Sequence, residues 1–276
     1  MPDQGDLRYP PGADRSALEA GHARTIEELE RRFTAASEDS QRDWELKART
    51  LEASLTLLGG GPPQADEAVA AQFAAARDYV RGIRPTRSRP PAGHNPARYP
   101  PYDFSWTGVS NGGIGTLSIY GPDKSSGEIG ADLWSSTAGA GSTGVYVGDW
   151  FYSQSEDTWS VLVQASISGV GAVGAAFGYA EAYAGLELFV RDHGSGATYS
   201  AVTDVYNKSA DGFGFDVTRF NKYVATVTSV PVHANTWYEV WAGAVQNVYA
   251  AGLVADAVSN YAMWVSPIAA GPLVIF

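Results

Sequence analysis

The chain contains no cysteine among its 276 residues. Disulfide bonds, thiol nucleophiles and cysteine-ligated metal ions are therefore excluded. Histidine is nearly as scarce, since only His22, His94, His193 and His233 occur and no two of them have the spacing of a metal-binding pair. The sequence accordingly predicts no metal site, no cofactor and no set of catalytic residues.

Long apolar runs are also missing. No stretch approaches the roughly 20 apolar residues of a membrane-spanning helix. The first residues, 1–6, lack the apolar segment of a secretory signal. We therefore expect a cytoplasmic protein without a membrane partner, although the sequence leaves open export by a route that needs no signal peptide.

Positive charge is scarce in one part of the chain. Residues 101–276 carry 5 Lys and Arg against 15 Asp and Glu, whereas residues 1–100 carry 14 against 15. So acidic a region repels phosphate backbones, and we do not expect nucleic acid as a partner. The segment 81–98 differs, because it holds five arginines and no acid. It is either a solvated linker that docks on the acidic region or a strip that binds anions.

The composition changes character near residue 100, and this divides the chain. Residues 1–15 are expected to be a disordered N-terminus, and 16–83 to form a helical hairpin for oligomerisation or packing. Residues 84–101 read as a Pro/Arg-rich linker, and 102–276 as an acidic β-sandwich domain.

The helical hairpin is predicted from apolar spacing. Within residues 16–58, apolar or small residues recur every three or four positions, at Ile26, Leu29, Phe33, Ala36, Ser40, Trp44, Ala48, Leu51, Leu55 and Leu58. The run 59–63 is Gly-Gly-Gly-Pro-Pro and ends this helix, and a second helix is expected over 66–83. A two-helix hairpin buries little apolar area alone. Its stripe therefore packs on another copy of the chain, which we favour, or on its own β-domain.

The remainder of the chain alternates with a period of two. Ten segments read as strands: 103–110, 115–121, 128–135, 143–152, 159–168, 172–191, 198–206, 219–232, 236–250 and 259–265. Gly, Asn, Asp and Pro clusters separate them, including 111–113 and 209–212. Frequent turns and little helix predict a mainly β domain, an antiparallel β-sandwich or jelly roll.

One segment is unusually rich in small residues. Between residues 172 and 184 every even position is Ala or Gly. On a regular strand these residues would form one flat face. The flat face suits tight packing of one sheet on another, a contact between subunits, or a hairpin that inserts into a membrane.

The candidate ligand site is a strand face that carries Trp237, Glu239 and Trp241. An acid between two indoles is the arrangement of a sugar platform, because rings stack on apolar sugar faces and a carboxylate accepts hydroxyl hydrogens. The alternative is an exposed acid on a strand whose tryptophans cover the sheet or a helix.

These patterns favour a non-enzymatic binding or structural protein, homo-oligomeric through its helices, whose β-sandwich presents a recognition surface for glycans. Two alternatives stay open: a polysaccharide-active jelly-roll enzyme, which rests on the many carboxylates, and a membrane-acting, toxin-like protein, which rests on the small-residue segment.

Overall fold

The structure is a computed structural model and describes residues 7–57, 71, 75 and 97–272. It contains one long helix followed by six strands. Their bounds are α1 Arg15–Leu57, β1 Ala97–Arg98, β2 Phe104–Ile119, β3 Glu128–Ser153, β4 Asp157–Asp192, β5 Thr198–Val232 and β6 Thr236–Pro272. The mainly β, antiparallel character predicted from the sequence is confirmed.

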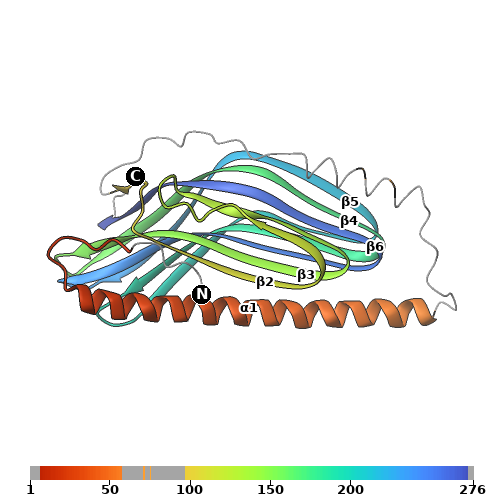
Figure 1. The fold of residues 1–276 in the computed structure, drawn as a ribbon, viewed down its shortest axis with the longest axis horizontal. Helices are drawn as coiled ribbons and strands as arrows, with labels where there is room; N and C mark the ends of the chain where they lie inside the picture. The colour runs from red at the N-terminus through yellow and green to blue at the C-terminus, as the bar shows by residue number, and fades with distance from the viewer. Residues whose placement is uncertain (1–6, 58–70, 72–74, 76–96, 273–276) are drawn as a thin grey trace.

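All the strands belong to one antiparallel sheet with the order β2-β3-β6-β4-β5, and β1 pairs with the end of β6. Most of these strands are far longer than an ordinary strand of five or six residues. They curve round at the right-hand end in Figure 1, so that each strand runs out in one layer and returns in the other.

Three of the pairing irregularities lie close to this bend. These register shifts occur at Gly113/Gly115 between β2 and β3, at Ser136/Ala138 between β3 and β6, and at Ala176/Gly178 between β4 and β5. Two further shifts, at Ala184/Gly185 and at Val163/Ala165, lie within the layers. Bulges raise the local twist and let a strand change direction. The result is a sandwich-like arrangement built by folding a single sheet over on itself.

The ten predicted strand segments therefore correspond, two by two, to β2 through β6. The clusters at 111–113 and 209–212 were expected to be turns between strands, but they lie inside β2 and β5. Gly212, with φ +61°, adopts the left-handed backbone that the prediction anticipated there. Glycine therefore marks a sharp change of direction in both cases, and the local sequence does not say whether the strand continues beyond it.

The small-residue segment also differs from its expected form. Ala172 lies with Val170 and Val258 in a separate small cluster, whereas Ala180 and Ala182 lie in the main core. The irregularity at 176–178 adds one residue and exchanges the two faces of β4. The segment therefore forms part of the bend between the layers and does not present one flat face.

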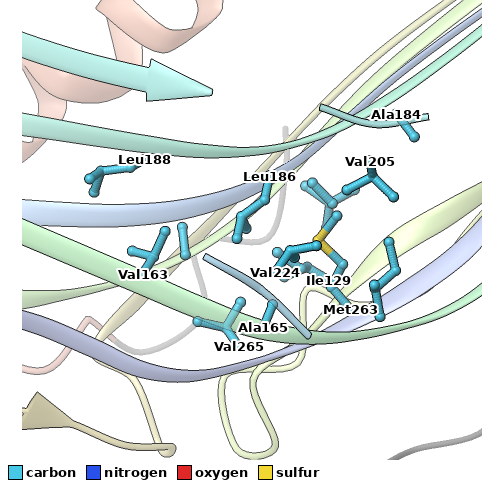
Figure 2. Close-up of a cluster of buried hydrophobic side chains, with 14 of the residues drawn as sticks. Ile129, Val163, Ala165, Ala184, Leu186, Leu188, Val205, Val224, Met263 and Val265 are labelled. Carbon is cyan, nitrogen blue, oxygen red and sulfur yellow. The ribbon is translucent and has the colours of Figure 1, made fainter. Parts of the chain in front are cut away.

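The main core fills the space between the two layers. Figure 2 shows side chains from both layers meeting there: Ile129, Val163, Ala165, Ala184, Leu186, Leu188, Val205, Val224, Met263 and Val265. Hydrogen bonds also cross from one layer to the other, as when Thr226 Oγ1 donates to the carbonyl oxygen of Leu186 at 2.9 Å. Packing and hydrogen bonding together fix how the layers face each other.

Helix α1 lies along the outer face of one layer of its own chain (Figure 1). Leu18 and Leu29 are buried there, and Ile26 and Phe33 pack beside them. This part of the apolar stripe thus follows the alternative of packing on its own β-domain, and it is not free for self-association while α1 is in place. In the described part of the chain, no helix is long and apolar enough to cross a membrane.

Several predictions concern the chain ends. Residues 7–14 were expected to be disordered, but Leu7, Tyr9 and Ala13 pack against the cluster beneath α1. The last residues of the predicted linker include β1, which joins the sheet. The predicted second helix at 66–83 falls almost entirely outside the described residues.

Candidate functional site: the sheet face beneath α1

The face covered by α1 belongs to what we call the helix-side layer, made of residues 104–113, 138–153, 178–192, 198–212 and 236–251. Polar and aromatic side chains line this face in cross-strand rows, since directly paired residues point the same way. Three glutamates from this face, Glu239, Glu187 and Glu181, each lie against a cationic or histidine side chain of α1. The three contacts differ sharply in burial.

The first contact is entirely buried. Oε1 of Glu239 lies 3.1 Å from Nδ1 of His22 on α1 and 3.0 Å from Nε2 of His193, which follows β4. Oε2 accepts a hydrogen bond from Nε1 of Trp241 at 3.1 Å. Glu239 is 0% exposed. One carboxylate thus joins the helix, the loop after β4 and strand β6.

Electrostatics favour the ionised form of this carboxylate. Burial by itself raises the pKa of Glu239, but the hydrogen bonds and the electrostatic interactions with His193 and His22 outweigh it and lower the pKa to about 2. A buried anion with several N–H donors is stable, whereas the same anion with a donor removed would be costly. The arrangement therefore fastens α1 to the sheet.

The local sequence of α1 permits this approach. Gly21 is the residue before His22, and a Cβ atom at that position would lie 2.0 Å from Nδ1 of His193. The ring of His22 stacks on Trp241 at 5.6 Å between centroids, and Trp150 meets His193 edge-on at 5.2 Å. Glycine in mid-helix normally costs stability, and here it makes room for the imidazole.

The second contact is less enclosed. Nη2 of Arg32 lies 3.3 Å from Oε1 of Glu187, and Tyr146 donates its hydroxyl hydrogen to the other carboxylate oxygen. Burial raises the pKa of Glu187, partly offset by Tyr146 and Arg32. Gly243 lies beneath the Tyr146 ring, where a Cβ atom would come within 2.0 Å of the ring. This contact too serves to hold α1 in place.

The third contact lies nearer the bend and is half open to solvent. Nζ of Lys47 is 3.4 Å from Glu181 and 3.2 Å from the hydroxyl of Tyr179, which also donates to Glu181. The exposed fractions of the Lys47 and Glu181 side chains are 36% and 28%. Exposed ion pairs contribute little stability, so α1 is held less firmly at this end.

Beside the third contact lies an open groove of about 410 Å³. Its lining combines carboxylates, tyrosines and asparagines: Asp39, Asp43, Glu181, Tyr183, Asn207, Asn247 and Tyr249. Asp39 and Asp43 come from α1 and form one wall, while the other residues come from β4, β5 and β6 and form the floor. We call this hollow the acidic groove.

The floor of the acidic groove is set by strand register. Tyr183 pairs with Asn207 on one side and Asn247 on the other, which makes an Asn-Tyr-Asn row across β5, β4 and β6. Neither asparagine side chain hydrogen-bonds to another residue in the described part of the chain. The Tyr183 hydroxyl donates to Asp204 at 2.8 Å, which holds its ring in place. Two amides with unused hydrogen-bonding capacity therefore flank one fixed ring.

A second hollow of about 440 Å³ lies on the other side of α1. It is lined by Phe33, Thr34, Glu38, Gln41, Arg42, Val109 and Ser110. Only two of these residues come from the sheet, and its apolar part consists of Phe33 from the helix and Val109 from β2. It offers fewer fixed polar groups than the acidic groove, which is therefore the stronger candidate.

The predicted sugar platform does share one sheet face, as its spacing indicated, but α1 covers most of it. Trp241 and Glu239 are 0% exposed, and only Trp237 is half-buried, against Tyr152. Its role as a glycan site remains a prediction. The Asn-Tyr-Asn row was not predicted from the sequence, because its three residues come from three different strands.

A pair of acids lies elsewhere, at the start of β2. Burial, together with a hydrogen bond to Asp103, raises the pKa of Asp149 to about 8. Two carboxyl groups in direct contact are closer than the roughly 5–10 Å used by glycoside hydrolases. Among the described residues, no group of three or more His, Asp or Glu is placed to hold a metal ion.

No family model and no curated protein matches the chain. Among solved structures, TmCBM61 in complex with β-1,4-galactotriose aligns at 9% identity and TM-score 0.22, covering 58% of this chain and 86% of that one. The C-terminal family 22 carbohydrate-binding module of Clostridium thermocellum Xyn10B aligns at 14% and 0.19, covering 63% and 96%. The enzymatically active domain of bacteriophage CBA120 tailspike protein 4 aligns at 14% and 0.23, covering 59% and 19%. With scores so low, these alignments carry no argument about the site.

Proposed function

We propose that the protein is a non-enzymatic carbohydrate-binding β-sandwich whose site is the acidic groove. The observation that carries the proposal is the Asn207-Tyr183-Asn247 row on the groove floor. Amides donate and accept hydrogen bonds as sugar hydroxyls do, and an aromatic ring offers a surface to the apolar side of a sugar.

The setting of the row supports the same conclusion. Ligand sites combine a concave shape with a few fixed polar groups, and rigid strands fix the floor residues better than a loop would. The wall residues Asp39 and Asp43 add carboxylate oxygens that accept hydrogen bonds from hydroxyl groups.

The test is a titration of the full chain with neutral oligosaccharides, among them galacto-, xylo- and cello-hexaose, by isothermal calorimetry. Saturable binding is expected, and the double change Asn207→Ala with Asn247→Ala is expected to weaken it by at least about fivefold, because each lost hydrogen bond costs roughly 0.5–1.5 kcal/mol.

The matched control is Asn221→Ala. Asn221 is an exposed asparagine on β5 in the other layer, and its removal should leave binding unchanged. If no oligosaccharide binds saturably, or if Asn221→Ala weakens binding as much as the groove changes do, the groove is not the site.

The Trp237-Glu239-Trp241 platform is a separate prediction. If the platform binds a glycan, Trp237→Ala should weaken binding at the platform without unfolding the protein, and the Asn207→Ala/Asn247→Ala double change should leave binding at the platform unchanged. If Trp237→Ala changes only the stability, the indole is part of the packing beneath α1 and the platform is withdrawn.

Self-association through the helical region is also kept as a proposal, now limited to the chain beyond Phe33. The earlier part of the stripe packs on its own sheet. Light scattering of the full chain at tens of micromolar should give a mass of at least twice 29.3 kDa, and a monomer would end this proposal.

A further inference from the structure

We infer that the acidic groove selects neutral glycans and rejects those that carry carboxylate or sulfate groups. This inference rests on the proposed function and adds the chemical class of the ligand. It is drawn from the spacing of the two free amides and from the charge of the groove, neither of which depends on the identity of the sugar.

The spacing of the floor residues sets the size of one binding unit. Neighbouring strands lie about 4.7–4.9 Å apart, so Asn207 and Asn247, two strands apart, are separated by roughly 10 Å between their Cα atoms. Their side chains take up part of this distance from either side of Tyr183. We place one six-membered sugar ring over the tyrosine, with an amide at each edge.

The amides place no demand on ligand charge. Each offers two N–H donors and one acceptor oxygen, and a sugar hydroxyl can satisfy either role. No positively charged residue lines this floor to pair with an ionised ligand group, because the floor residues lining the groove are neutral apart from Glu181.

The two cations of α1 next to the groove are already engaged. Lys47 pairs with Asp43 at 2.8 Å and with Glu181 at 3.4 Å, and Arg42 pairs with Asp39 at 3.4 Å. The three carboxylates of Asp39, Asp43 and Glu181 therefore outnumber the two cations with which they pair. A carboxylate or sulfate on a bound sugar would meet uncompensated negative charge at short range, where like charges repel most strongly.

The charge of the whole β-domain acts in the same direction. Residues 101–276 carry 15 acids against 5 bases, and a field of one sign slows the approach of ligands with the same sign. Because these charges lie at the surface, salt screens part of their effect, over about 10 Å at 0.1 M. Discrimination should therefore be greatest at low ionic strength.

The experiment compares glycans that differ only in charge. The probes are oligogalacturonide with its methyl ester, hyaluronan oligosaccharide with its carboxyl-reduced form, and chondroitin sulfate with desulfated chondroitin, alongside the neutral hexaoses. In each pair we expect the less charged member to bind at least about tenfold more tightly at 20 mM salt, and the ratio to shrink at 500 mM salt.

The double variant Asp39→Asn with Asp43→Asn tests whether the groove carboxylates cause the discrimination. It should reduce several-fold the ratio between the dissociation constants of the charged and the less charged glycan. Its control is Glu27→Gln with Glu30→Gln, which removes the same charge from exposed positions nearer the start of α1 and should leave the ratio almost unchanged.

The outcomes separate the two proposals. If none of the glycans binds, the proposed function itself fails. If glycans bind but the charged member of each pair binds as well as its partner, or the Asp39/Asp43 double variant does not narrow the ratio, the groove binds sugars without selecting charge and this inference is overturned.

Discussion

The two ends of α1 meet the sheet through similar chemistry and with opposite consequences. Near its start, His22 meets Glu239, which is 0% exposed and holds three nitrogen partners. Near its end, Lys47 meets Glu181, and both side chains remain partly exposed. In each case a strand glutamate receives a basic side chain from the helix.

Burial makes the difference between them. A buried carboxylate is costly when it loses a partner, so its contacts fix the helix in one place. An exposed ion pair contributes at most about 1 kcal/mol, so the Lys47–Glu181 contact holds α1 only weakly. The acidic groove lies open to solvent beside this contact. The same residue types thus anchor α1 near its start and hold it only loosely beside the acidic groove.

The largest expected effect tests this contrast directly. Glu239→Gln should lower the free energy of unfolding by about 3–5 kcal/mol, because it removes the buried charge and replaces one acceptor oxygen by an NH2 group that cannot accept a hydrogen bond. The measurement is urea denaturation at pH 7.

Its control is the same chemical change at the other end of the helix. Glu181→Gln should cost less than about 1 kcal/mol. Equal losses for Glu239→Gln and Glu181→Gln would show that burial does not separate the two contacts.

The pH dependence of stability sharpens the comparison. The pKa of Glu239 is about 2 in the folded protein, below the value of about 4.3 in an unfolded chain. Its contribution is therefore complete above about pH 4.5 and is lost as the pH falls towards 2. Wild type should lose stability across this range more steeply than Glu239→Gln, as followed by urea denaturation at pH 5, 4 and 3. Parallel curves would contradict the assigned ionised state.

A smaller effect tests the close approach of the helix. Gly21→Ala should destabilise the protein by about 1–3 kcal/mol, because the new methyl group overlaps the His193 ring. Helix propensity alone predicts the opposite sign, a gain of up to about 1 kcal/mol. The midpoint of thermal unfolding shows whether Gly21→Ala stabilises or destabilises the protein. Ala23→Gly, at an exposed position of the same turn, measures the effect of helix propensity alone. A stabilised Gly21→Ala would mean that α1 does not need this approach.

The smallest expected effect concerns Lys47. Lys47→Ala should change the unfolding free energy by less than about 1 kcal/mol, yet it should speed amide hydrogen exchange in α1 around residues 41–53 without changing it around 18–30. Hydrogen exchange followed by mass spectrometry measures both regions. A uniform change along the helix would show that α1 is held as one unit.

Periodicity predicted part of this architecture because it reports local geometry. The three- and four-residue spacing predicted a helix over 16–58, and α1 begins at Arg15 and continues to Leu57, the last described residue of that stretch. The two-residue spacing put Trp237, Glu239 and Trp241 on a single face. Both spacings follow from the repeat of the helix or strand backbone, which is set by residues close together in the sequence.

The sequence also indicated that each long strand changes direction, through its glycine clusters. It did not distinguish a bend from a turn, because both need the same backbone freedom. Whether the chain reverses or continues depends on which strand it pairs with, and that is a contact between distant residues.

The site was decided by tertiary structure for the same reason. His22 meets Glu239 across 217 positions of sequence, and the Asn-Tyr-Asn row exists only because β4 pairs with β5 and β6 in one register. The sequence by itself determined the helix, the strand faces and the acidic charge of the β-domain. Only the folded sheet decided which acids are buried and which amides remain free, because burial and pairing are properties of distant segments brought together.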